Sequence, residues 1–73
     1  MKKPIECMII HNSGPSQRIL YKNDDWSYTV RVNKMCFNKG KYIKHYTLDF
    51  DSFHLAYDFV NFKDTEVNKP VAN

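Results

Sequence analysis

Strict alternation of apolar and polar residues between Trp26 and Val32 is the feature of this sequence that most constrains its fold. Side chains on a strand point to opposite faces in turn, so the apolar members share one face and the polar members the other. The pattern predicts a strand with one covered face. The residues expected on that covered face are Trp26, Tyr28, Val30 and Val32.

Three further apolar segments are bounded by turn-forming residues and predict strands at 5–11, 17–21 and 42–50. The turns between them are expected at 12–16, 22–25 and 38–41, where Gly40 takes positive φ without steric cost. We therefore expect an antiparallel sheet of three to four strands. In the last strand, simple alternation places Lys44 on the same face as Tyr42, Tyr46, Leu48 and Phe50.

One segment, 52–62, carries helical periodicity, because Leu55, Phe59 and Phe62 recur at positions i, i+4 and i+7, with Ala56 and Val60 beside them. Asp51 stands where an N-terminal capping side chain is favoured. The helix is expected to cover one face of the sheet, which gives an α+β fold. We predict a single domain over residues 1–62, followed by a disordered, flexible C-terminal tail at 63–73.

At 73 residues the chain has room for one small core. No stretch approaches the roughly 20 apolar residues of a membrane span, and the start of the chain does not read as a signal peptide. We expect a protein of the bacterial cytoplasm that makes no membrane contact and is a monomer. Its two cysteines, Cys7 and Cys36, are expected to be free and mostly buried thiols.

Charge is segregated along the chain. Residues 31–44 carry five basic side chains and no acidic one, whereas residues 49–66 carry five acidic side chains and one lysine. Although the net charge is only +3, the chain therefore has a basic part and an acidic part. Such a dipolar domain is suited to docking on a larger partner.

Catalytic and metal chemistry find little support in the sequence. Five residues are possible metal ligands, but none of their spacings is that of a zinc site. No motif builds an oxyanion hole around a serine, and Asp49 and Asp51 are better explained as residues of a strand-to-helix junction. We expect no enzyme, no cofactor and no metal. The possible ligands are Cys7, His11, Cys36, His45 and His54.

The basic segment is the strongest candidate for a binding surface. Aromatic residues are interleaved with its cations, a combination that also holds single-stranded nucleic acid. Docking on a protein is the preferred interpretation, with nucleic acid contacted only indirectly. The predicted partner-binding residues are Arg31, Lys34, Phe37, Lys39, Lys41 and Lys44, with Met8 and Ile10 as apolar contacts that could equally belong to the core.

The whole chain resembles the small transcription regulators of lytic phages, in particular of a Xanthomonas phage. The resemblance runs from the opening Met-Lys-Lys-Pro-Ile-Glu-Cys-Met-Ile-Ile through Trp-Ser-Tyr-Thr-Val-Arg-Val to the closing Asn-Lys-Pro-Val-Ala-Asn. It implies a host-takeover protein that binds bacterial RNA polymerase at the N-terminal region of the β′ subunit. Inhibition of initiation by promoting σ displacement, and antitermination during elongation, are the implied activities.

A second resemblance is confined to residues 48–59, Leu-Asp-Phe-Asp-Ser-Phe-His-Leu-Ala-Tyr-Asp-Phe. This segment is similar to small anti-CRISPR proteins in which an Asp-Phe-Asp-Ser turn leads a strand into a single helix. It implies a CRISPR complex as the alternative partner. A single-stranded nucleic-acid-binding domain is the other alternative.

Overall fold

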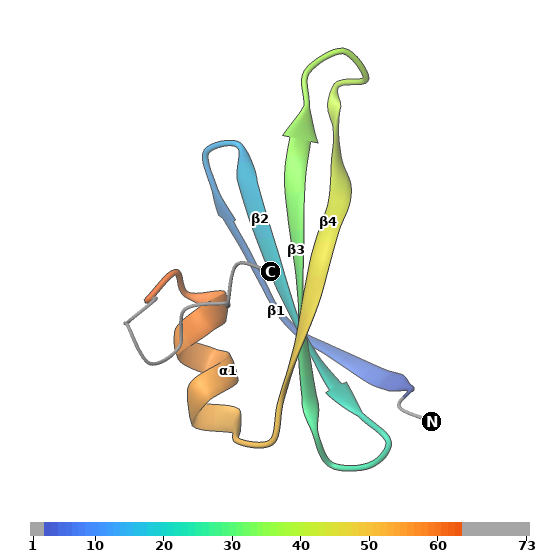
Figure 1. Ribbon diagram of the computed structural model, residues 1–73, viewed down its shortest axis with the longest axis vertical. Helices are drawn as coiled ribbons and strands as arrows, with labels where there is room; N and C mark the ends of the chain where they lie inside the picture. Colours follow the sequence, from blue (N-terminus) through green and yellow to red (C-terminus); the bar gives the residue numbers. More distant parts are fainter. Residues whose placement is uncertain (1–2, 64–73) are drawn as a thin grey trace.

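The computed structural model describes residues 3–63, which form one antiparallel sheet and one helix (Figure 1). The sheet has four strands in the order β1-β2-β3-β4, and the helix follows the last strand. The predicted α+β fold, with its antiparallel sheet and single C-terminal helix, is confirmed. Of the tail predicted at 63–73, all but Lys63 lies outside the described residues. The elements are β1 (Pro4–Ser13), β2 (Ser16–Asn23), β3 (Tyr28–Cys36), β4 (Lys41–Phe50) and α1 (Phe53–Val60).

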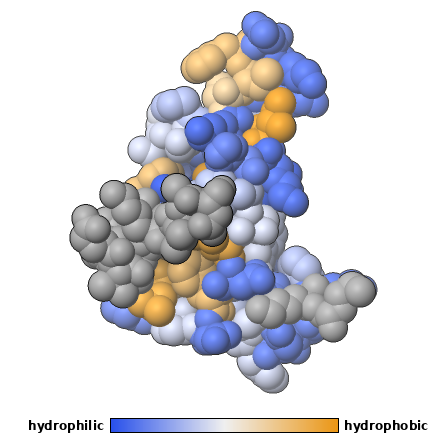
Figure 2. Space-filling view, viewed as in Figure 1, coloured by the Kyte–Doolittle hydropathy of each residue, from blue (hydrophilic) through white to orange (hydrophobic). Residues whose placement is uncertain are grey.

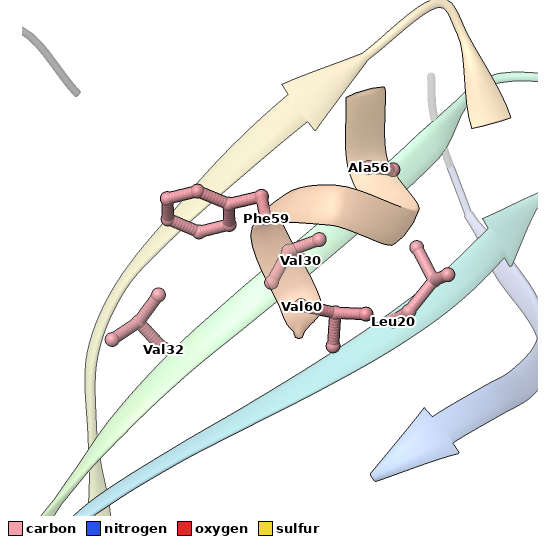
Figure 3. Packing of buried hydrophobic residues seen from close by; sticks show 6 residues of the cluster. All are labelled: Leu20, Val30, Val32, Ala56, Phe59 and Val60. Carbon is pink, nitrogen blue, oxygen red and sulfur yellow. The ribbon is translucent and has the colours of Figure 1, made fainter. Parts of the chain in front are cut away.

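Helix α1 covers one face of the sheet and closes a small core (Figure 3). On the sheet side, Leu20 pairs with Val30 across β2 and β3, and both side chains are fully buried. On the helix side, Phe59 is the largest buried side chain. Partly buried residues of β1 and β4 pack around this centre. The complete buried cluster is Leu20, Val30, Val32, Ala56, Phe59 and Val60.

One residue of the apolar face predicted for the helix does not face the sheet. Ala56, Phe59 and Val60 are buried, whereas Leu55 is 39% exposed. The prediction that Leu55 faces the sheet is therefore wrong. The N-cap residue is Ser52 rather than Asp51, and it makes no side-chain capping hydrogen bond. The Asp51–Ser52 junction between strand and helix lies where the sequence predicts it.

Arg18 on β2 fixes the C-terminal end of α1 to the sheet. Its guanidinium carbon lies 4.2 Å from the ring centroids of both Phe59 and Phe62. One of its terminal nitrogens donates a hydrogen bond of 2.8 Å to the carbonyl oxygen of Phe59. On β1, His11 Nδ1 is 3.1 Å from Oδ1 of Asn61. The end of the helix is thus held to two strands by polar contacts as well as by packing.

Trp26 is not part of the core, contrary to the sequence-based prediction. It lies in the turn between β2 and β3 at a φ of 69°, and its side chain is 76% exposed. The turn is closed by a hydrogen bond of 2.9 Å from Asn23 N–H to the carbonyl oxygen of Ser27. Because the turn takes up residues to Ser27, strand β3 begins only at Tyr28. The ammonium of Lys22 lies 4.7 Å from the centroid of the exposed indole ring.

An irregularity in β4 changes the face on which Lys44 lies. Val32 pairs with Tyr46 and Asn33 with Lys44, so His45 has no partner across the ladder. A residue inserted in this way reverses the alternation beyond it. Lys44 therefore shares the uncovered face with Arg31 and Thr47 instead of facing the helix with Tyr46, as simple alternation predicts.

The two cysteines are less buried than the sequence predicts. Both cysteines are free, as expected, but Cys7 is exposed and Cys36 is half-buried, so the prediction of mostly buried thiols is wrong.

Within residues 3–63, no helix has the length and hydropathy needed to cross a membrane.

Replacing Leu20 by alanine should lower the free energy of unfolding by about 2–5 kcal/mol, because the side chain is fully buried beneath the helix. The same substitution at Leu55 should cost less than about 1 kcal/mol, since that side chain is already 39% exposed. Urea denaturation of the two variants measures both values. Equal losses would contradict the observed exposure of Leu55.

Candidate docking surface

The β3–β4 hairpin projects beyond the helix and beyond the neighbouring β1–β2 hairpin (Figure 1). Its last contacts with that neighbour are a hydrogen bond of 2.7 Å from Met35 N–H to the Pro15 carbonyl and one of 3.1 Å from the Tyr42 hydroxyl to the Gly14 carbonyl. Gly40 closes the turn at a φ of 64°, with its N–H 2.8 Å from the Cys36 carbonyl. The hairpin end is therefore built by local backbone bonds and presents its side chains to solvent.

The side chains at this end combine a large apolar group with several cations. Phe37 is 81% exposed, more than any other large apolar side chain among the described residues. Figure 2 shows apolar and strongly polar surface side by side at the same end of the molecule. Exposed apolar surface rimmed by polar side chains is typical of protein-binding sites. We call Lys34, Phe37, Lys39 and Lys41 the hairpin tip; Lys34 lies at its base, where it pairs with Ser16 of β2.

The other predicted contact residues lie elsewhere. Arg31 and Lys44 lie on the uncovered face of the sheet, below the hairpin tip. Met8 and Ile10 belong to β1, which β2 and β3 separate from β4. Their exposed fractions are 37% and 59%, so the alternative that they are core residues is wrong. The predicted site is therefore divided into a tip, a part on the open face and a distant edge strand.

Charge separation along the sequence becomes charge separation in space. The hairpin tip lies at one end of a molecule that extends 37 Å along its longest axis (Figure 1). The opposite end holds Asp24 and Asp25 in the β2–β3 turn and Asp49 and Asp51 where β4 leads into the helix. The end that holds these aspartates also holds lysines, so its charge is mixed. The segment from Cys36 to Lys44, at the other end, contains no acidic residue. The segment from Cys36 to Lys44 thus presents positive charge that no carboxylate of its own offsets.

The residues considered for metal binding or catalysis are dispersed. Across residues 3–63, no three His, Cys, Asp or Glu side chains gather closely enough to hold a metal ion. His54 lies 3.5 Å from Asp58 one turn along the helix, and His45 packs edge-on against Tyr46 at a centroid distance of 5.0 Å. Both contacts are local, one within a turn of the helix and one between neighbouring residues of a strand.

A second exposed apolar group was missed by the sequence analysis. Phe53 and Tyr57 on α1 are 40% and 42% exposed, and their ring centroids are 5.6 Å apart. Phe53 also packs against Tyr28, at 5.4 Å between centroids. Their spacing of four residues was the available signal, but it was outweighed by the apolar repeat assigned to Leu55, Phe59 and Phe62.

Comparison of the chain with family models, with curated proteins and with solved structures found no match in any of the three.

Replacing Phe37 by serine should leave the free energy of unfolding within about 0.5 kcal/mol of the parent value, because the ring is exposed and contributes little to the core. Thermal unfolding followed by circular dichroism measures this. A loss above about 1 kcal/mol would mean that Phe37 stabilises the fold and is not reserved for a partner.

Proposed function

We propose that this protein is a phage-type transcription regulator that binds bacterial RNA polymerase at the N-terminal region of the β′ subunit. The observation that carries the proposal is the hairpin tip, where Phe37 is 81% exposed between uncompensated lysines. An exposed ring of this size is better explained by a partner than by the stability of the isolated chain. The resemblance of the whole sequence to small phage regulators supplies the identity of that partner.

The tip has the properties of a docking element. Its turn is fixed by two backbone hydrogen bonds to the Cys36 carbonyl, from Lys39 and Gly40, so the chain loses little conformational freedom when it binds. Phe37 offers apolar area for the centre of an interface, and the exposed Lys34, Lys39 and Lys41 lie on the same hairpin. Aromatic residues at the centre and charge at the rim are the usual division in protein interfaces.

The proposed mechanism is steric and electrostatic rather than catalytic. A standard interface buries about 800 Å² on each partner, a large share of the surface of so small a domain. Bound near the site where σ contacts the polymerase, the domain competes with σ and inhibits initiation. The same occupancy near the RNA exit path opposes terminator-hairpin formation and produces antitermination. The protein acts as a monomer in the bacterial cytoplasm and needs no cofactor for these activities.

Replacing Lys39 and Lys41 together by glutamate should lower the association rate with core polymerase about tenfold at low salt and less at high salt, because exposed charges act mainly through steering and are screened. Surface plasmon resonance with immobilised core enzyme measures the rate. Initiation from a σ-dependent promoter should be inhibited correspondingly less.

The matched control is the double variant Lys3→Glu with Lys63→Glu. It changes the net charge equally, and both of its positions are exposed and lie outside the hairpin. Its association rate should stay within about twofold of the parent value if local rather than net charge guides binding. Equal effects of the two double variants would contradict docking through the hairpin tip. Retention of a CRISPR complex instead of polymerase from bacterial lysate would favour the alternative partner.

A further inference from the structure

Only one face of the sheet is covered by α1, and the other face carries an ordered row of polar side chains. Asn33 is 5% exposed although it lies on this open face. Its amide nitrogen donates to Gln17 Oε1 at 2.8 Å, and its Oδ1 accepts a hydrogen bond from Arg31 Nε at 3.1 Å. These hydrogen bonds hold the Nε side of the Arg31 guanidinium against the sheet. The terminal amino groups of Arg31 take no part in it.

Beside this row lies a hollow of about 310 Å³. It is lined by both cations of the open face, Arg31 and Lys44, and by no acidic side chain. Lys44 reaches this face only because the register shifts at His45. The remaining lining residues are Pro4, Tyr21, Thr29 and Thr47.

Of the polar side chains that line the hollow, one already makes hydrogen bonds within the protein and others have donors available for a ligand. The Thr29 hydroxyl donates to Asp49 Oδ1 at 2.7 Å and accepts from Asn23 Nδ2 at 2.8 Å, so it is already occupied. In the described part of the chain, neither Arg31 nor Lys44 pairs with a carboxylate. Two cations therefore border the hollow with charge available for an anion, and Thr47 adds a hydroxyl.

We infer that this hollow binds a nucleotide unit of a single-stranded nucleic acid, with its phosphate between Arg31 and Lys44. A guanidinium held at Nε presents its terminal amino groups as a fork, which suits the oxygens of a phosphate. The half-buried ring of Tyr21 and the adjacent Pro4 give the base an apolar surface on which to stack. The volume is at the lower end of the range of small-molecule sites, which suits one nucleotide rather than a folded partner.

This site is distinct from the hairpin tip and does not depend on binding to polymerase. Asp49 lies beside the hollow but is held by Thr29 and does not line it. Lys34 and Lys41 lie on the same two strands, but each stands three residues from Arg31 or Lys44, so strand alternation directs them to the opposite face of the sheet. Binding of a strand in the hollow therefore does not require these lysines.

The first test compares two single-charge variants from the same strand. A fluorescently labelled ten-nucleotide oligouridylate is titrated with the parent protein, with Lys44→Gln and with Lys41→Gln, which removes an equal charge outside the hollow. The Kd should rise roughly five- to tenfold for Lys44→Gln and less than about twofold for Lys41→Gln. Equal increases, or no binding by the parent protein, would overturn the inference.

The second test locates the ligand by NMR titration with oligouridylate and with uridine monophosphate. Shifts of Tyr21, Arg31 and Thr47 with the oligonucleotide alone would support the site and identify a strand as its ligand. Shifts of the same residues with both probes would support it and show that a free nucleotide suffices. Shifts confined to Lys34, Lys39 and Lys41 would show general attraction to the basic tip and overturn the site. Neither test uses polymerase, so failure of the docking proposal would leave both readouts unchanged.

Discussion

Packing of Phe59 against the sheet is the interaction on which the rest of the structure depends. Its ring is fully buried and lies 5.6 Å from the ring of Phe50 and 4.2 Å from the guanidinium carbon of Arg18. Its carbonyl accepts the hydrogen bond that Arg18 donates. One residue therefore joins the helix to β2 and β4 through apolar and polar contacts, and the small core is built around it. A single helix attached in this way covers one face of four strands and leaves the other face open.

That limited cover explains where the candidate binding surfaces lie in so short a chain. The β3–β4 hairpin extends past the region that the helix covers, so its end presents Phe37 and three lysines to solvent (Figure 1). The open face carries the Asn33 row and the hollow beside Arg31. Both surfaces use side chains that the core does not need. The described residues thus have room for both the proposed docking element and a separate polar site.

Much of the fold was predictable because local patterns agree with it. Turn residues between short apolar runs defined four antiparallel strands, and the spacing around Phe59 defined one helix. The predictions failed at residues whose local pattern fits two arrangements, because tertiary packing then determines which arrangement forms. Trp26 continues the alternation of β3, but it lies in the preceding turn at positive φ. Leu55 follows the helical repeat, but the helix packs through Ala56, Phe59 and Val60.

The candidate site was predictable in composition but not in arrangement. The basic run and Phe37 were recognisable from charge and residue type, and the hairpin brings four of those residues to one end. Lys44 was assigned to the wrong face because no residue signals the register shift at His45, and that shift is what places it beside Arg31. Met8 and Ile10 remained ambiguous because only the position of β1 at the edge of the sheet determines their exposure.

Site-directed photo-crosslinking tests the docking account most directly. A photoreactive phenylalanine analogue is placed at Phe37 in one preparation and at Tyr57, on the helix, in another, and each is irradiated with core RNA polymerase. The account predicts a crosslink from position 37 to the N-terminal region of β′ and a much weaker one from position 57. A crosslink to β′ from position 57 alone, or no crosslink from position 37, would contradict docking through the hairpin tip.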